Sequence, residues 1–140
     1  MGKPSVMIVD DYAPDRVFSR LMLQRSGCFG EVFEVPGAEE AIELFRRWRE
    51  DAKAEMPDGF PPAIILLDLN MPKMNGFDFL ERFSSIVDQR YVPDVVVLTS
   101  SGEDVDRGRA GAFGLVRDYM TKPLTVDKAH ELFNSHSSSS

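Results

Sequence analysis

The stretch Ala63-Ile-Ile-Leu-Leu67 is the most apolar run in the sequence, and Asp68 follows it directly. A continuous apolar run of this length is typical of a strand that is buried on both faces of a parallel sheet. Two further runs, over residues 5–9 and 94–98, have the same form and also end at polar residues. The sequence therefore predicts a central parallel sheet.

Amphipathic segments alternate with these strands. Their apolar residues recur every three or four positions, which is typical of helices that cover a sheet. We expect helices at 14–26, 38–52, 76–87, 103–113 and 126–133, and shorter strands at 31–35 and 118–121. In the first helix, Val17, Phe18 and Leu21 fall on one apolar face together with Met22. Five strands alternating with five helices predict a doubly wound α/β fold.

Length and composition restrict the class of protein. A chain of 140 residues has the length of one domain, and 16 basic against 23 acidic residues give a net charge of −7. This charge disfavours binding to nucleic acids or anionic membranes. The single cysteine allows no internal disulfide, and no apolar run approaches the roughly 18 residues of a membrane span. We therefore expect a cytoplasmic domain over residues 3–134, followed by a disordered Ser-rich tail at 135–140.

Five polar residues stand where predicted strands end: Asp10, Asp11, Asp68, Thr99 and Lys122. The carboxyl ends of parallel strands meet at one edge of the sheet, where ligands bind in this fold class. Taken singly, each residue has an ordinary structural explanation as a turn or helix-capping residue. Taken together and in this strand order, they predict one site with three carboxylates, a hydroxyl and an ammonium group.

The residue types in this set suggest a particular chemistry. Clustered carboxylates repel one another, and a hard divalent cation such as Mg²⁺ relieves that repulsion while keeping positions for water or phosphate oxygens. A lysine supplies a point charge for an anion, and a threonine hydroxyl can donate a hydrogen bond to it. The set therefore suits a metal ion and a phosphoryl group, with one carboxylate as the nucleophile.

Four segments carry a resemblance to a known family: Val-Asp-Asp at 9–11, Leu-Leu-Asp-Leu-Asn-Met-Pro-Lys-Met-Asn-Gly at 66–76, Val-Val-Leu-Thr-Ser-Ser at 96–101 and Tyr-Met-Thr-Lys-Pro at 119–123. With them the chain resembles a response-regulator receiver domain of two-component signalling, from about Lys3 to Phe133. The resemblance implies a flavodoxin-like fold with strand order 2-1-3-4-5. The loop at 53–62 and the segment Leu-Leu-Asp-Leu-Asn-Met-Pro-Lys at 66–73 are similar to stand-alone receivers that partner phytochrome-type kinases.

The resemblance also implies roles for the site residues. Asp68 would accept a phosphoryl group from a histidine kinase or a histidine phosphotransfer protein. Asp11 and Asp68 would bind Mg²⁺ directly and Asp10 mostly through water, and the backbone carbonyl of Asn70 would complete the protein share of the metal site. Lys122 would bind a phosphoryl oxygen.

A switch is implied as well. Thr99 would turn toward the phosphoryl group, and Tyr119 would follow it into the vacated space. Pro123 matches a proline that follows a cis peptide bond, a form favoured only before proline. The downstream partner would bind the face made by the helix near 103–113, the last strand and the last helix. The protein would be a monomer or weak dimer and no enzyme, beyond self-phosphorylation from small donors and self-dephosphorylation.

Two other functions fit part of the pattern. A phosphatase of the haloacid dehalogenase type also uses a nucleophilic aspartate with a threonine, a lysine and Mg²⁺. It usually needs a second aspartate two residues later as acid–base catalyst, and Asn70 stands there. The other alternative is a degenerate receiver that binds partners without being phosphorylated.

Overall fold

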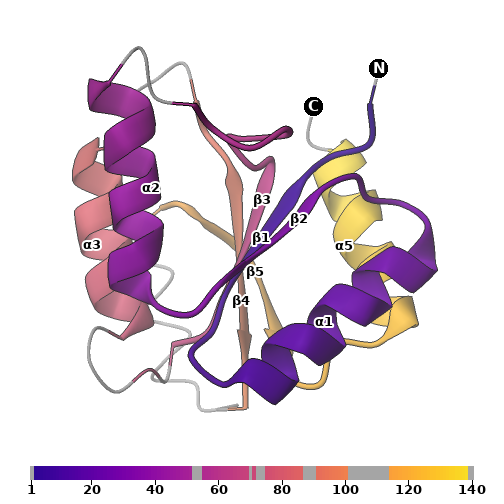
Figure 1. Ribbon diagram of the computed structural model, residues 1–140. Helices are drawn as coiled ribbons and strands as arrows, with labels where there is room; N and C mark the ends of the chain where they lie inside the picture. Colours follow the sequence, from indigo (N-terminus) through magenta and orange to yellow (C-terminus); the bar gives the residue numbers. More distant parts are fainter. Residues whose placement is uncertain are drawn as a thin grey trace.

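The described residues form one parallel five-stranded sheet with helices on both faces (Figure 1). The computed structural model describes residues 2–51, 55–69, 71, 75–86, 91–100 and 114–138. The strands are β1 (Val6–Val9), β2 (Val32–Val35), β3 (Ile64–Leu67), β4 (Asp94–Thr99) and β5 (Val116–Thr121). Their order is β2-β1-β3-β4-β5 and every pairing is parallel. The predicted fold class and strand order are confirmed.

Four helices lie in the described part of the chain: α1 (Ala13–Ser26), α2 (Ala38–Glu50), α3 (Gly76–Ile86) and α5 (Val126–Ser138). Figure 1 shows α1 and α5 on one face of the sheet and α2 and α3 on the other. The helix expected at 103–113 lies outside the described residues. No helix within the described ranges is long and apolar enough to cross a membrane.

Alternate side chains of each central strand enter two separate cores. In β1, Met7 and Val9 pack with α2 and α3, whereas Val6 and Ile8 pack with residues of α1 and α5. Successive side chains of a strand point to opposite faces, so a strand covered on both faces must be apolar at every position. This arrangement explains the unbroken apolar runs in the sequence.

Most of the apolar face expected for α1 points to solvent, although Met22 of that face packs against the core. Val17 is 37% exposed, and Phe18 and Leu21 are each 43% exposed, whereas Leu23 is fully buried. The other side of α1 carries a helical stripe of Arg16, Ser19, Arg20 and Leu23, in which Ser19 and Leu23 are buried and the Arg16 and Arg20 side chains are 16% and 38% exposed. The two arginines of this stripe form ion pairs with Glu34 on β2, at 3.3 and 3.1 Å. These ion pairs connect that side of α1 to β2, and the residues Val17, Phe18 and Leu21 lie on the solvent side.

The last helix is longer than expected, because α5 continues through Ser138. The guanidinium group of Arg117 donates hydrogen bonds to the hydroxyl and the carbonyl oxygen of Ser135, at 3.2 and 2.8 Å. The His136 ring lies 2.6 Å from a carboxylate oxygen of Asp94. These contacts from β4 and β5 hold the last turns of α5, so residues 135–138 of the expected tail are helical.

Candidate functional site

The strand ends place the predicted site residues at one edge of the sheet. Asp10 follows β1, Asp68 follows β3, Thr99 ends β4 and Lys122 follows β5. The backbone pairing continues to these positions: the Asp68 amide donates to the carbonyl of Val9, and the Lys122 amide to the carbonyl of Thr99, both at 3.0 Å. The sheet itself therefore sets the spacing of the site.

Three carboxylates gather at this edge. Asp10, Asp11 and Asp68 each offer an oxygen, and these atoms lie within 4.8 Å of one another. Oxygens on opposite sides of a bound Mg²⁺ are about 4.2 Å apart, because each Mg–O bond is about 2.1 Å. The carboxylates therefore fit one cation with small side-chain movements, and exposed Asp11 leaves the cluster open to water. Asn70, the predicted carbonyl ligand, lies outside the described residues.

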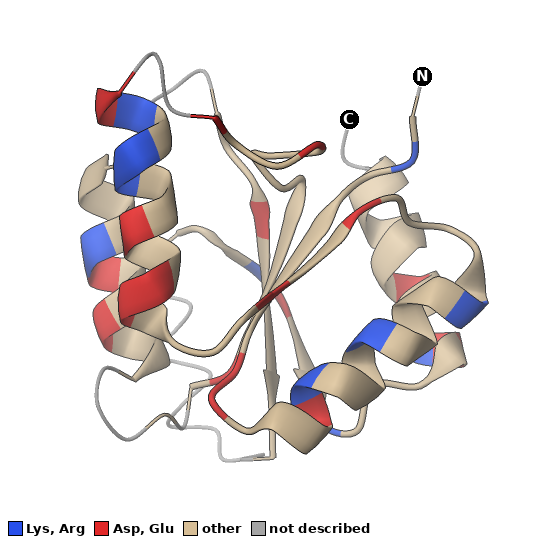
Figure 2. Cartoon of the chain, viewed as in Figure 1, with Lys and Arg blue, Asp and Glu red and all other residues tan. Residues whose placement is uncertain are grey.

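The ammonium group of Lys122 lies among three carboxylates. Its Nζ atom donates to Asp10 Oδ2 at 2.7 Å, to Asp15 Oδ2 at 3.0 Å and to Asp68 Oδ2 at 3.2 Å. Asp15, in the first turn of α1, was not among the predicted site residues. An acidic residue in the first helical turn directly after an acidic pair is the signal that could have found it. Figure 2 shows the acidic segments where β1 ends and α1 begins.

Burial and charge shift the acid–base equilibria at this edge. Burial raises the pKa of Asp10 above its usual value, and hydrogen bonds from the Lys122 ammonium and the Tyr12 amide offset this only in part. Burial lowers the pKa of Lys122, but its hydrogen bonds to Asp10 and Asp15 and the charge of Asp68 outweigh that and raise it. One ammonium group thus faces four carboxylates when Asp11 is included, and a divalent cation would relieve the excess negative charge.

Two neighbouring residues support the carboxylates. Arg16 donates from Nη1 to the carbonyl oxygen of Asp10 at 2.8 Å, which ties α1 to the end of β1. A Cβ atom on Gly76 would lie 2.8 Å from the carbonyl oxygen of Asp68 and 2.7 Å from Cδ2 of Leu69. Only glycine fits this close approach, so the glycine that ends the 66–76 motif lets α3 begin against the Asp68 loop.

The two residues expected to switch lie on adjacent strands. Thr99 is 5% exposed and pairs with Thr121, while Tyr119 lies two residues before Thr121 on the same face of the sheet. The Tyr119 ring is partly buried and packs against the core on the α2 and α3 side. The peptide bond between Lys122 and Pro123 is cis, as predicted.

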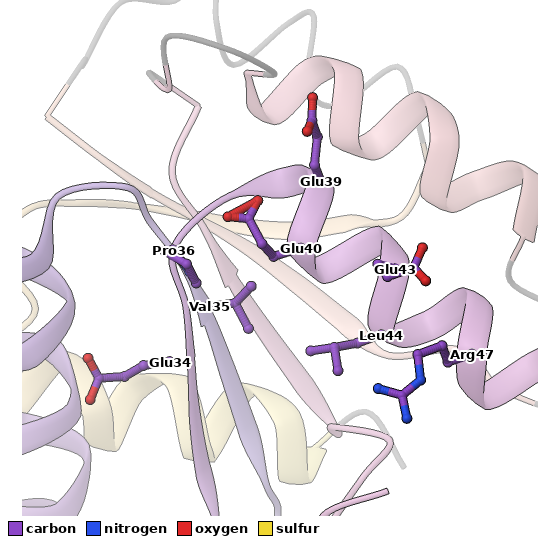
Figure 3. Close-up of a pocket in the computed structure, with 8 residues that line it drawn as sticks. All are labelled: Glu34, Val35, Pro36, Glu39, Glu40, Glu43, Leu44 and Arg47. Carbon is purple, nitrogen blue, oxygen red and sulfur yellow. The ribbon is translucent and has the colours of Figure 1, made fainter. Parts of the chain in front are cut away.

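A separate hollow lies between the end of β2 and α2 (Figure 3). Glu39, Glu40 and Glu43 of α2 line it together with Arg47. Glu34 is also part of the lining, but Figure 3 shows its side chain pointing toward α1, in agreement with its two arginine ion pairs. None of the carboxylates of the metal-site cluster, nor Thr99 or Lys122, is part of this lining, so the hollow is distinct from the carboxylate site.

Comparison with known proteins agrees with the fold and the strand-end motifs. The family model for the response regulator receiver domain matches residues 6–134. The two-component response regulator ORR1 of Oryza sativa subsp. japonica is 30% identical over 135 residues, which cover 95% of this chain and 55% of that protein. The chain thus spans about half the length of the ORR1 proteins it matches.

Solved structures agree with this match. A two-component response regulator from Cytophaga hutchinsonii superposes with a TM-score of 0.80 at 25% identity, covering 97% of this chain and 98% of that one. The bacteriophytochrome response regulator RtBRR superposes with a TM-score of 0.74 at 30% identity, covering 96% of this chain and 78% of that one. The fold, the strand-end motifs and the family match agree: the chain belongs to the response regulator receiver domain family.

Proposed function

We propose that this protein accepts a phosphoryl group on Asp68 from a histidine kinase or a histidine phosphotransfer protein, with Mg²⁺ at the adjacent carboxylates. The observation that carries the proposal is the position of Asp68. Its carboxylate is grouped with Asp10 and Asp11 and also accepts a hydrogen bond from Lys122 at 3.2 Å. A carboxylate beside both a metal site and a fixed ammonium group is suited to phosphoryl transfer.

The transfer step follows from these positions. An oxygen of Asp68 attacks the phosphorus atom, the phosphorus–nitrogen bond of the donor phosphohistidine breaks, and an acyl phosphate forms on Asp68. Bound Mg²⁺ would supply charge neutralisation for the phosphoryl oxygens. Lys122 supplies a fixed ammonium group, and the buried Thr99 supplies a hydroxyl donor at the end of β4.

The output of the proposed reaction is a shift between two conformations. Phosphorylation adds a charge of about −1.5 to −2 at an edge that is already acidic. Thr99 turns inward to bind the new oxygens, and Tyr119 moves into the space that it leaves. Both residues lie on β4 and β5, so the change reaches the face that includes β5 and α5, where an unidentified downstream protein binds.

The exposed apolar stripe of α1 is the surface where we propose that the phosphodonor docks. Tyr12 is 58% exposed and precedes α1, and Phe18 and Leu21 continue the stripe along the helix. The stripe starts two residues after Asp10 and therefore begins beside the phosphoacceptor edge. An amphipathic helix of a kinase or phosphotransfer protein would cover it. The likeness to a bacteriophytochrome response regulator supports a phytochrome-type kinase as the donor.

The proposal includes the setting in which the protein works. We place it in the cytoplasm as a signalling protein, a monomer or weak dimer, rather than as an enzyme with a turnover substrate. Its net charge of −7 supports protein partners over nucleic acids and membranes.

Phosphoryl uptake tests the proposal. Wild-type protein incubated with acetyl phosphate and Mg²⁺ should gain the mass of one phosphoryl group, and Asp68→Asn should not. Asp58→Asn, the same change at an exposed position near the opposite edge of the sheet, should behave as wild type. No uptake by the wild type would indicate a degenerate receiver, and sustained hydrolysis of p-nitrophenyl phosphate would indicate a phosphatase.

A further inference from the structure

The ammonium group of Lys122 has no donor left for a new ligand. A lysine ammonium carries three N–H donors. In the structure these donors are matched by three carboxylate acceptors, on Asp10, Asp15 and Asp68. A phosphoryl oxygen on Asp68 can therefore bind Lys122 only after one of the three acceptors has been displaced.

The three acceptors differ in how easily they can be displaced. The side chains of Asp10 and Asp68 are 5% and 7% exposed, whereas that of Asp15 is 42% exposed. A buried carboxylate that loses its ammonium partner bears a large desolvation penalty, whereas an exposed one is solvated by water at little cost. Of the two partners that remain carboxylates once Asp68 is phosphorylated, Asp10 and Asp15, Asp15 is therefore the one that leaves at the lower cost.

The position of Asp15 makes it independent of the other two carboxylates. Asp10 and Asp68 directly follow strands, and the sheet fixes them, whereas Asp15 belongs to the first turn of α1. Arg16, the next residue, holds this turn against the carbonyl oxygen of Asp10. Asp15 is thus held within reach of Lys122 without being part of the carboxylate cluster that fits a cation.

We propose that Asp15 is a positioning residue that occupies the third donor of Lys122 in the unphosphorylated protein and yields it to a phosphoryl oxygen. The inference rests on the proposed phosphorylation of Asp68. Asp15 and the phosphoryl group compete for one N–H of Lys122. Asp15 therefore destabilises the loaded state, in which Asp68 carries a phosphoryl group or its mimic, and holds Lys122 in place in the unloaded state. Removing the charge of Asp15 favours the loaded state for two reasons, since it ends the competition and lowers the repulsion felt by an anion.

Binding of beryllium trifluoride, a noncovalent mimic of the phosphoryl group, tests this role in the presence of Mg²⁺. Titrations followed by fluorine NMR would compare wild type, Asp15→Asn, Asp15→Glu and the control Asp58→Asn. Asp15→Asn should bind about two- to fivefold more tightly, the effect of one partly exposed ion pair. Asp15→Glu keeps the charge and should return toward wild type, and Asp58→Asn should equal wild type. Asp15→Ala provides a second neutral variant.

The structure of the loaded protein gives a readout that is independent of affinity. With beryllium trifluoride bound, Lys122 Nζ should contact the fluoride and lie more than 4 Å from Asp15, beyond ion-pair distance. The proposal is overturned if both neutral variants bind as wild type or more weakly, or if the contact of 3.0 Å persists in the loaded state. Failure of the wild type and of Asp58→Asn to bind the mimic would instead refute the proposed function and, with it, this role of Asp15.

Discussion

Asp10 is only 3% exposed at the end of β1, so water solvates the negative charge of its carboxylate poorly. Burial raises its pKa despite the hydrogen bond from Lys122. The folded protein therefore holds this proton more tightly than the unfolded chain does. The contribution of Asp10 to the free energy of unfolding must then fall as pH rises from 3.8 through the raised folded value.

We expect Asp10→Asn to be more stable than wild type in EDTA at pH 7, because it removes a buried charge. The advantage should shrink as pH falls through the same window, since Asp10 then becomes neutral in the wild type too. Urea unfolding followed by the fluorescence of Trp48, the single tryptophan, measures both effects. With saturating Mg²⁺ the order should reverse, because the variant lacks one carboxylate of the proposed metal site. A variant that is less stable in EDTA at every pH would contradict this account.

At the scale of a single element, α1 separates the residues that stabilise the fold from those that are free to bind a partner. Leu21 is 43% exposed and Leu23 is fully buried, although both belong to the same helix. Leu23→Ala should reduce the free energy of unfolding by about 2–5 kcal/mol, the usual cost of emptying a buried leucine site. Leu21→Ala should change it by less than about 0.5 kcal/mol.

The Leu21→Ala variant also distinguishes docking of the phosphodonor from the phosphorylation reaction itself. If α1 docks the phosphodonor, Leu21→Ala should slow phosphotransfer from the cognate kinase, identified by profiling candidate kinases, while uptake from acetyl phosphate stays as in wild type. A kinase rate equal to wild type would rule out this part of the stripe as the docking surface.

The connection from β3 to α3 depends on a backbone contact that admits no side chain. At Gly76 a Cβ atom would approach backbone atoms of Asp68 and Leu69 to 2.8 Å. Gly76→Ala should therefore displace the Asp68 loop, destabilise the fold by about 1–3 kcal/mol and slow uptake from acetyl phosphate. Gly2→Ala is the matched control, because no heavy atom lies within 4 Å of its added methyl group. Thermal unfolding of the two variants in parallel checks the prediction, and equal melting temperatures would contradict it.

Elements whose pattern comes from burial on both faces could be predicted from the sequence. The runs that became β1, β3 and β4 are apolar throughout their interiors, at 6–9, 64–67 and 95–98, and their bounds match within one residue. The orientation of α1 could not be predicted in this way, because its apolar stripe and its buried stripe are different faces. Arg16 and Arg20 pair with Glu34 on the buried side, a contact between α1 and β2 that spacing within α1 does not reveal.

At the scale of the whole molecule, the far end of α5 is tied to the edge of the sheet opposite the carboxylate site. Ser135 accepts two hydrogen bonds from Arg117 on β5, and His136 contacts Asp94, the first residue of β4. Ending the chain after Asn134 should therefore lower the free energy of unfolding by about 1–3 kcal/mol through these lost contacts.

Ending the chain after Ser138 keeps the same contacts and should leave the stability unchanged. Urea unfolding of the two truncated proteins measures the difference. Equal stability of the two would mean that residues 135–138 act as the disordered tail that their serine content suggested.

In the candidate site too, the residues at strand ends could be predicted from the sequence, and a residue on a helix could not. Asp10, Asp11, Asp68, Thr99 and Lys122 were recognisable because each ends or follows a strand, and parallel strands share one edge. Asp15 follows no strand, and its partner Lys122 lies 107 residues away in the sequence. The two meet because α1 packs against β1 and α5, and Lys122 lies in the connection from β5 to α5, so the contact depends on how helices and sheet are arranged.

The most direct test of the account is to locate the phosphoryl group. Protein treated with acetyl phosphate and Mg²⁺ would be reduced with borohydride, which converts a phosphorylated aspartate to homoserine, and its peptides would be mapped by mass spectrometry. The account predicts homoserine at position 68, and none there when Mg²⁺ is replaced by EDTA. Homoserine at another aspartate, or at none in a protein that has gained a phosphoryl group, would contradict it.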